Sequence, residues 1–160
     1  MAGRYSLSAY DDYFCIKPPL LLWLAVLYLS RAVTVPIVAA VGGFAGVSSD
    51  AIALLKSSWS LEGLGPSVAA ALVLYAMIRR SPTAPRFVRR VSMHGRLVLA
   101  VSAVLDLALS GFLLASQSVQ PGHMPPGLIT AGADIYFLLY VLLARRVRDT
   151  FSDFPAVVAH

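Results

Sequence analysis

The chain of 160 residues is strongly apolar, since 58% of its residues are hydrophobic and only 13% are charged. A soluble domain carries about 25% charged residues, so this composition excludes an ordinary soluble protein and indicates an integral membrane protein. The formal net charge is +5, and the mean hydropathy is +0.75. The single cysteine, Cys15, excludes an internal disulfide and a multi-thiolate metal site.

Four apolar segments are long enough, or nearly long enough, to cross a bilayer: about residues 20–44, 61–78, 97–115 and 128–144. The first is too long for a signal-peptide core, so we interpret it as an uncleaved span. Pro36 predicts a kink within it, because proline removes one helix hydrogen bond. The second is the weakest, because Gly63, Gly65 and Pro66 interrupt its start. We therefore expect one all-α membrane domain over residues 1–160, built as a bundle of four transmembrane helices.

Basic residues are distributed unevenly between the connecting segments. Residues 79–96 contain no acid and six arginines, and three more open the C-terminal segment; these are Arg79, Arg80, Arg86, Arg89, Arg90, Arg96, Arg145, Arg146 and Arg148. The positive-inside rule predicts that the loop 79–96 and the C-terminus are cytoplasmic. An even number of spans then makes the N-terminus cytoplasmic too. Eleven basic residues lie inside on this topology, and only Lys56 lies outside.

The same arginines suggest contact with lipid headgroups as well as a topological signal. A nucleic-acid partner is not expected. The loop 79–96 contains two prolines, and Phe87 is its only aromatic residue available for base stacking.

Three ionisable residues lie deep within the apolar segments: Arg31, Asp106 and Asp134. From the helix rise, they lie about 16, 13 and 16 Å from the cytoplasmic edge, which is near the middle of a core about 30 Å thick. We expect Arg31 to pair with Asp134, Asp106 or both, with Asp134 as the preferred partner. A fixed ion pair that sets helix register is the simplest interpretation. A bound proton, a cation from another protein or a proton relay stays open, because the ionised set sums to −1.

Other segments carry weaker signals. The spacing of Gly42 and Gly46 is typical of close helix packing. Two acidic or aromatic stretches near the ends suggest partner docking through Tyr10, Asp11, Asp12, Phe151 and Phe154. The three histidines are far apart on this topology, and catalytic or phosphate-binding motifs are absent from the sequence, so we expect no metal, no cofactor and no enzymatic activity.

Both ends of the chain resemble a known family. The N-terminal pattern consists of Tyr10, Asp11, Lys17, Pro18, Trp23 and Arg31, and the C-terminal pattern of Asp134, Arg145, Arg146, Arg148 and Phe151. These patterns resemble the uncharacterised bacterial inner-membrane family called domain of unknown function 2919. The resemblance implies a bacterial inner membrane and four spans, and it implies no activity. Asp106 and the loop 79–96 have no counterpart in it.

Three functions fit these observations. We favour a non-catalytic accessory or assembly subunit of a larger inner-membrane complex, with the bilayer and other membrane subunits as partners. The first alternative is a proton- or ion-coupled transporter component that uses Asp106 and Asp134. The second is a protein that binds anionic lipids through Arg86, Arg89 and Arg90.

Overall fold

The computed structural model describes residue 10 and residues 15–44, 63–81, 83–116 and 126–153. Its described residues form six helices and no strand beyond an isolated β-bridge between Tyr10 and Ile16. The helices are α1 (Leu20–Leu29), α2 (Arg31–Phe44), α4 (Leu64–Ile78), α5 (Arg86–Ser116), α6 (Pro126–Leu143) and α7 (Arg145–Ser152). The expected all-α fold is therefore confirmed for the described part of the chain.

Prolines mark where three of these helices begin. Pro19 precedes α1, and its carbonyl accepts a hydrogen bond from the Leu22 amide at 2.9 Å. Pro85 precedes α5, and Pro126 is the first residue of α6. Proline is tolerated at a helix start because its missing N–H would have no partner there. The positions of these prolines thus set where the three helices start.

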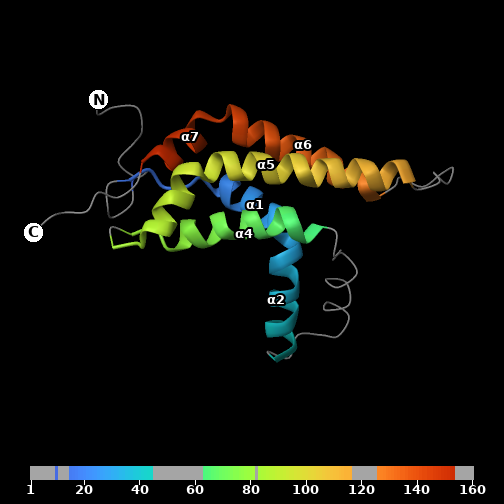
Figure 1. Cartoon of the computed structure of the whole chain (residues 1–160), viewed down its shortest axis with the longest axis horizontal. Helices are drawn as coiled ribbons and strands as arrows, with labels where there is room; N and C mark the ends of the chain where they lie inside the picture. Colours follow the sequence, from blue (N-terminus) through green and yellow to red (C-terminus); the bar gives the residue numbers. More distant parts are fainter. Residues whose placement is uncertain (1–9, 11–14, 45–62, 82, 117–125, 154–160) are drawn as a thin grey trace, which may run out of the picture.

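Figure 1 shows the elongated arrangement of the helices. The long helix α5 packs between α4 and α6, while α1 lies against α4 and α5, and α7 packs against α5 (Figure 1). The helix α2 leaves this bundle almost at a right angle. The bundle and its projecting helix are the frame on which the polar residues are held.

One described helix is long and apolar enough by itself to span a membrane, over Arg86–Phe112. Two helix pairs would pass only as bent spans: α1 with α2, bent by 87°, and α6 with α7, bent by 63°. The helix α4 has 15 residues and is about 22 Å long, shorter than a hydrocarbon core of about 30 Å. Large apolar side chains point outward throughout, including Leu20, Phe112 and Leu143, each more than 70% exposed. Such a surface is compatible with a membrane location.

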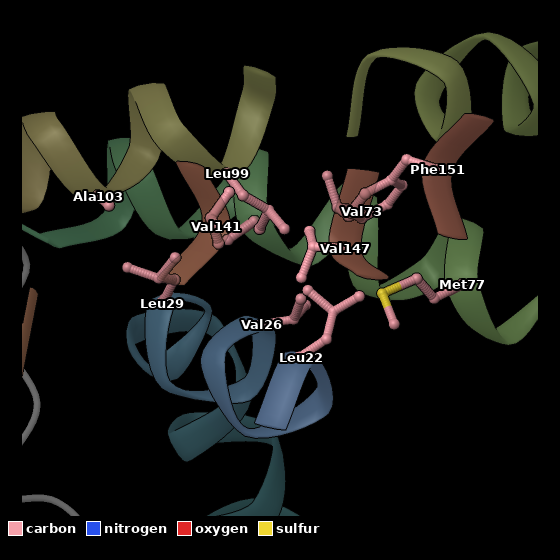
Figure 2. Packing of buried hydrophobic residues seen from close by; sticks show 11 residues of the cluster. Leu22, Val26, Leu29, Val73, Met77, Leu99, Ala103, Val141, Val147 and Phe151 are labelled. Atoms are coloured by element: carbon pink, nitrogen blue, oxygen red, sulfur yellow. The ribbon is translucent and has the colours of Figure 1, made fainter. Parts of the chain in front are cut away.

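The apolar core runs along the inner faces of the bundle (Figure 2). Every bundle helix contributes to it, and its members are Leu22, Val26, Leu29, Ala70, Val73, Met77, Leu99, Ala103, Val141, Val147 and Phe151. Lipid tails are as apolar as these side chains, so in a bilayer close van der Waals packing holds the helices together rather than exclusion of water. The core fixes α1, α5 and α6 relative to one another. Asp106 lies on α5 and Asp134 on α6, and Arg31 follows shortly after the end of α1.

Two expected boundaries were wrong. The segment 20–44 is not one helix kinked at Pro36, because the break lies at Ser30 and α2 continues through Pro36. The segment 79–96 is only partly a loop, because α5 already begins at Arg86 and its first three turns carry four of the six arginines. The break at Ser30 is accompanied by side-chain contacts described below, whereas the start of α5 follows Pro85.

Candidate functional site: a buried arginine–carboxylate cluster

The break between α1 and α2 directs Arg31 toward the bundle. The Ser30 hydroxyl donates to the Leu27 carbonyl at 3.2 Å, and the Arg31 Nη1 atom donates to the Tyr28 carbonyl at 3.3 Å. Two carbonyls beside the break thus have side-chain donors, which a bent helix requires in apolar surroundings. The Thr34 hydroxyl donates to the Ser30 carbonyl at 3.2 Å on the other side of the break. The sequence around Ser30 therefore stabilises its own bend.

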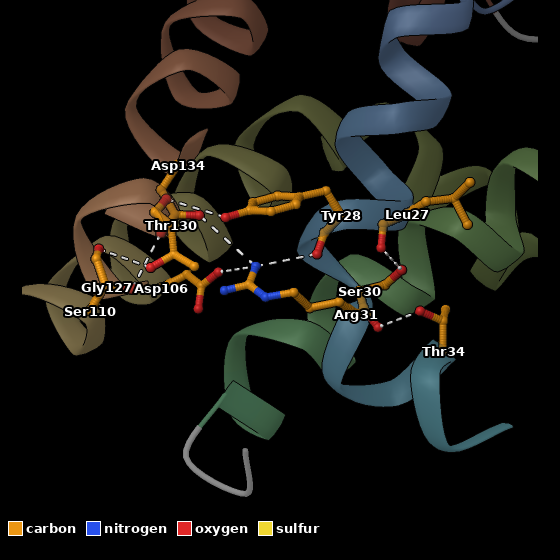
Figure 3. A network of polar contacts seen from close by, with 10 residues as sticks. All are labelled: Leu27, Tyr28, Ser30, Arg31, Thr34, Asp106, Ser110, Gly127, Thr130 and Asp134. Carbon is orange, nitrogen blue, oxygen red and sulfur yellow. Dashed lines mark hydrogen bonds and ion pairs between the residues drawn. The ribbon is translucent and has the colours of Figure 1, made fainter. Parts of the chain in front are cut away.

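Arg31 contacts both buried carboxylates at once (Figure 3). Its Nη1 atom lies 2.7 Å from Asp106 Oδ2 and 4.0 Å from Asp134 Oδ1. Its guanidinium carbon lies 4.4 Å from the centre of the Tyr28 ring, a favourable cation–π distance. The Arg31 side chain is 28% exposed, whereas those of Asp106 and Asp134 are 7% and 0% exposed. One partly exposed cation therefore faces two enclosed carboxylates.

Residues of α5 and α6 complete the surroundings of Asp134. The Ser110 hydroxyl donates to Asp134 Oδ2 at 3.5 Å, which is a long hydrogen bond. The Tyr28 hydroxyl donates to the Thr130 carbonyl at 3.2 Å, one helical turn before Asp134 (Figure 3). Asp134 and Asp106 both lie within 4.0 Å of the same Arg31 Nη1 atom. Asp134 is thus held by weaker polar contacts than Asp106.

The arrangement carries a net charge of −1 when all three groups are ionised. Asp106 Oδ2 and Asp134 Oδ1 accept no well-aligned hydrogen bond, although both face the guanidinium. Their stabilisation is therefore mainly electrostatic, and a bound proton would bring the cluster to neutrality. No group of three or more His, Cys, Asp or Glu suitable for a metal ion occurs in the described ranges.

The prediction that the three charges meet is correct, but the expected order of partners is reversed. Asp106, expected as the less preferred partner, is the closer partner of Arg31. Asp134, expected as the main partner, lies 4.0 Å away. The bend at Ser30 places Arg31 at the first position of α2, and from there its side chain reaches Asp106 on α5 more closely than Asp134 on α6.

Sequence reasoning missed two members of this site, Tyr28 and Ser110. Tyr28 precedes Arg31 by three residues and Ser110 follows Asp106 by four, the spacings at which helical neighbours share a face. That spacing could have identified them. Two polar residues on the same helices do not join the site: the Ser102 hydroxyl is buried without a hydrogen-bond partner, and Tyr136 is 54% exposed.

The basic residues gather at the end of the bundle where α7 lies. Arg80 donates through Nη1 to the Ile16 carbonyl at 3.1 Å and through Nη2 to the Asp153 carbonyl. The Asp153 carboxylate in turn accepts a hydrogen bond from the Ile16 amide at 3.0 Å. Arg80 thus joins the segment before α1 to the residue after α7.

Arg96 secures the end of α6. Its Nε atom donates to the Val141 carbonyl at 3.1 Å and its Nη2 atom to the Leu142 carbonyl at 2.6 Å. These carbonyls belong to the last turn of α6, where intrahelical donors are missing. Ala144 then adopts an extended conformation, and α7 starts in a new direction. Arg80 and Arg96 therefore have structural roles within the described part of the chain.

Among the predicted docking residues, Phe151 is corrected by the structure. Its side chain is buried in the core of the chain, and its ring packs directly beside Gly95. It is therefore not accessible to a partner. Tyr10 forms its bridge with Ile16. Asp11, Asp12, Phe154 and Gly46 lie outside the described residues, while Gly42 lies in α2. The docking and helix-packing roles of those residues stay predictions.

A family model described as "Protein of unknown function (DUF2919)" matches residues 5–153. This match covers most of the chain, so the protein belongs to that family, as the patterns at its two ends had indicated. None of the curated proteins and none of the solved structures matches the chain.

Proposed function

We propose that this member of the DUF2919 family is a non-catalytic accessory or assembly subunit of a larger complex in the bacterial inner membrane. In this proposal the chain has four membrane segments, the first of which is bent at Ser30 so that α2 runs sideways, and both termini are cytoplasmic. One contact supports the same side of the membrane for both termini: Arg80 binds the carbonyls of Ile16 and Asp153, which lie near the two ends of the described chain. The concentration of arginines at the same end agrees with the positive-inside rule.

The observation that carries the subunit role is the helix α2. It leaves the bundle at 87° to α1, and its outer part exposes Ile37, Val38 and Val41, each between 56% and 62%. Since α1 has only 10 residues, about 15 Å, the bend lies about half-way across a hydrocarbon core. An apolar helix that projects sideways at this depth offers a packing surface to a neighbouring membrane protein.

The arginine–carboxylate cluster supports the same role. It lies at the root of α2, where Arg31 joins the first turn of that helix to α5 and α6. Removing one member of a buried ion pair is strongly destabilising, so the pair holds a defined geometry. A helix fixed at one angle loses little freedom when a partner binds to it. On this proposal, the cluster sets the angle of the docking helix.

Site-specific photo-crosslinking in native membranes tests the proposal. A photoreactive amino acid at Ile37 or Val41 should form one adduct of defined mass with another membrane protein. The same probe at Leu143, which is 74% exposed at the end of α6, serves as the matched control and should not form it. If α2 yields only lipid adducts and the protein purifies as a stable monomer under mild detergent, the subunit role is wrong.

A second candidate, proton-coupled transport, is favoured by one specific observation. Two enclosed carboxylates share a single guanidinium, so one of them is available to take up and release a proton. Asp134→Asn should then abolish pH-driven flux into vesicles, whereas Asp149→Asn on α7 should leave it intact. Equal flux from wild type, both variants and empty vesicles would exclude this candidate.

A further inference from the structure

A groove of about 460 Å³ lies between α5 and α7, away from the buried cluster. Its basic lining residues are His94, Arg96 and Arg148. The rest of its lining is mainly apolar and consists of Met93, Leu97, Ala100, Leu142 and Phe151, together with Ser152. The two kinds of side chain meet at the end of the bundle that carries most of the arginines.

The basic side chains of the groove keep donors for a ligand. Arg96 uses Nε and Nη2 to hold the last turn of α6, which fixes the guanidinium in place and leaves its Nη1 atom as a further donor. Arg148 is 60% exposed, and its Nε atom lies 3.7 Å from the neighbouring Asp149 carboxylate, a weak surface pair. The His94 Nδ1 atom lies 3.0 Å from the Arg90 carbonyl, which leaves Nε2 as the other ring position.

The apolar side of the groove continues onto the outer surface of the bundle. Leu97 and Met93 are 63% and 59% exposed on α5, and they lie on the same helix as the candidate span Arg86–Phe112. The helix α7 buries Val147, Thr150 and Phe151 and exposes its arginines, as an amphipathic helix at a membrane surface does. The groove thus joins an apolar surface to a cationic rim where headgroups would lie.

We propose that this groove binds the phosphate headgroup of an anionic glycerophospholipid from the leaflet on the α7 side. The phosphate accepts hydrogen bonds from Arg96 and Arg148, and an acyl chain lies along Met93, Leu97 and Leu142. A basic pocket between helices at the cytoplasmic surface suits this ligand, because it matches charge at one end and apolar surface at the other. The inference goes beyond the subunit role and shares with it only the membrane location.

The test compares lipid retention by purified protein, measured by native mass spectrometry after exchange into phosphatidylglycerol or phosphatidylcholine vesicles. Wild type should retain phosphatidylglycerol in preference to phosphatidylcholine. Arg148→Gln should lower that retention about tenfold or more, because it removes a charge-assisted hydrogen bond to the phosphate. Arg145→Gln removes the same charge from an exposed position of α7 outside the groove, where it makes no such bond and is screened by salt, so it should change retention by less than about twofold.

Three results would overturn the inference. Equal losses from the two variants would mean that lipid follows overall charge and not the groove. Equal retention of phosphatidylcholine would mean that the basic rim plays no part. Displacement of the lipid by inorganic phosphate alone would mean that the site takes a free anion. Because crosslinking from α2 does not enter this test, the lipid site and the subunit role can fail separately.

Discussion

Removing the positive charge of Arg31 should destabilise the protein strongly. In Arg31→Gln, Asp106 and Asp134 would remain enclosed, with side-chain exposures of 7% and 0%, and no cation within the cluster. Breaking a buried ion pair by removing one partner costs about 3–5 kcal/mol, because the remaining charge stays desolvated. We therefore expect the free energy of unfolding to fall by about that amount.

The distances predict how far each second substitution rescues the first. Coulomb attraction varies inversely with separation, so the 2.7 Å contact of Arg31 with Asp106 is about 1.5 times stronger than the 4.0 Å contact with Asp134. Arg31→Gln/Asp106→Asn should recover about 1–3 kcal/mol of the loss, the range of coupling between residues in contact. Arg31→Gln/Asp134→Asn should recover less.

The assay is a double-mutant cycle on the free energy of unfolding in bicelles, measured by steric trapping. Arg90→Gln removes an exposed arginine from α5, outside the cluster, and should change stability by less than about 0.5 kcal/mol. The reasoning is refuted if neither double variant is more stable than Arg31→Gln alone. A greater rescue by Asp134→Asn than by Asp106→Asn would refute the order of the two contacts.

The remaining predictions concern the packing, the end of α6 and the topology. Gly95→Ala should destabilise by about 1–3 kcal/mol in thermal-unfolding assays, because its Cβ would overlap the buried Phe151 ring. Gly111→Ala has open space around its Cβ and should be neutral or slightly stabilising. Arg96→Gln should speed hydrogen exchange in α7 by roughly tenfold or more, since it removes two charge-assisted hydrogen bonds to the last turn of α6; unchanged exchange would contradict the capping role. In Arg90→Cys with Cys15→Ser, the new thiol should react with an impermeant thiol reagent only when the cytoplasmic side of the membrane is exposed. Labelling from outside intact cells would show that the topology is the opposite of the proposed one.

Composition and hydropathy were sufficient to predict an all-α chain and a cluster of charges at one depth. Depth follows from counting residues along a helix, so the sequence alone assigns Arg31, Asp106 and Asp134 to one level. Counting residues does not determine how each helix is rotated about its axis or in which direction it runs. These two unknowns decide which carboxylate lies nearer to Arg31, and the predicted order was accordingly wrong.

The bend at Ser30 was missed because its cause is distributed over several side chains. Pro36 gives an obvious local signal, yet a proline within a helix removes only one hydrogen bond and α2 accommodates it. At Ser30 the break depends on a serine hydroxyl, on the Arg31 guanidinium and on a carboxylate of α5 that lies 75 residues further along the chain. A local sequence pattern cannot predict a contact between residues so far apart in the chain.

The bend and the buried charges are best understood as one feature. A helix break inside an apolar region exposes carbonyls that need donors, and Arg31 supplies one donor while its charge is balanced by α5 and α6. A straight apolar span would need neither the arginine nor the two carboxylates, and well-packed apolar residues are often as stable as a buried ion pair. We infer that the charged cluster provides a defined direction for α2, which is bent by 87° from α1. This is why we infer that the direction of α2 is the property on which the protein's role depends.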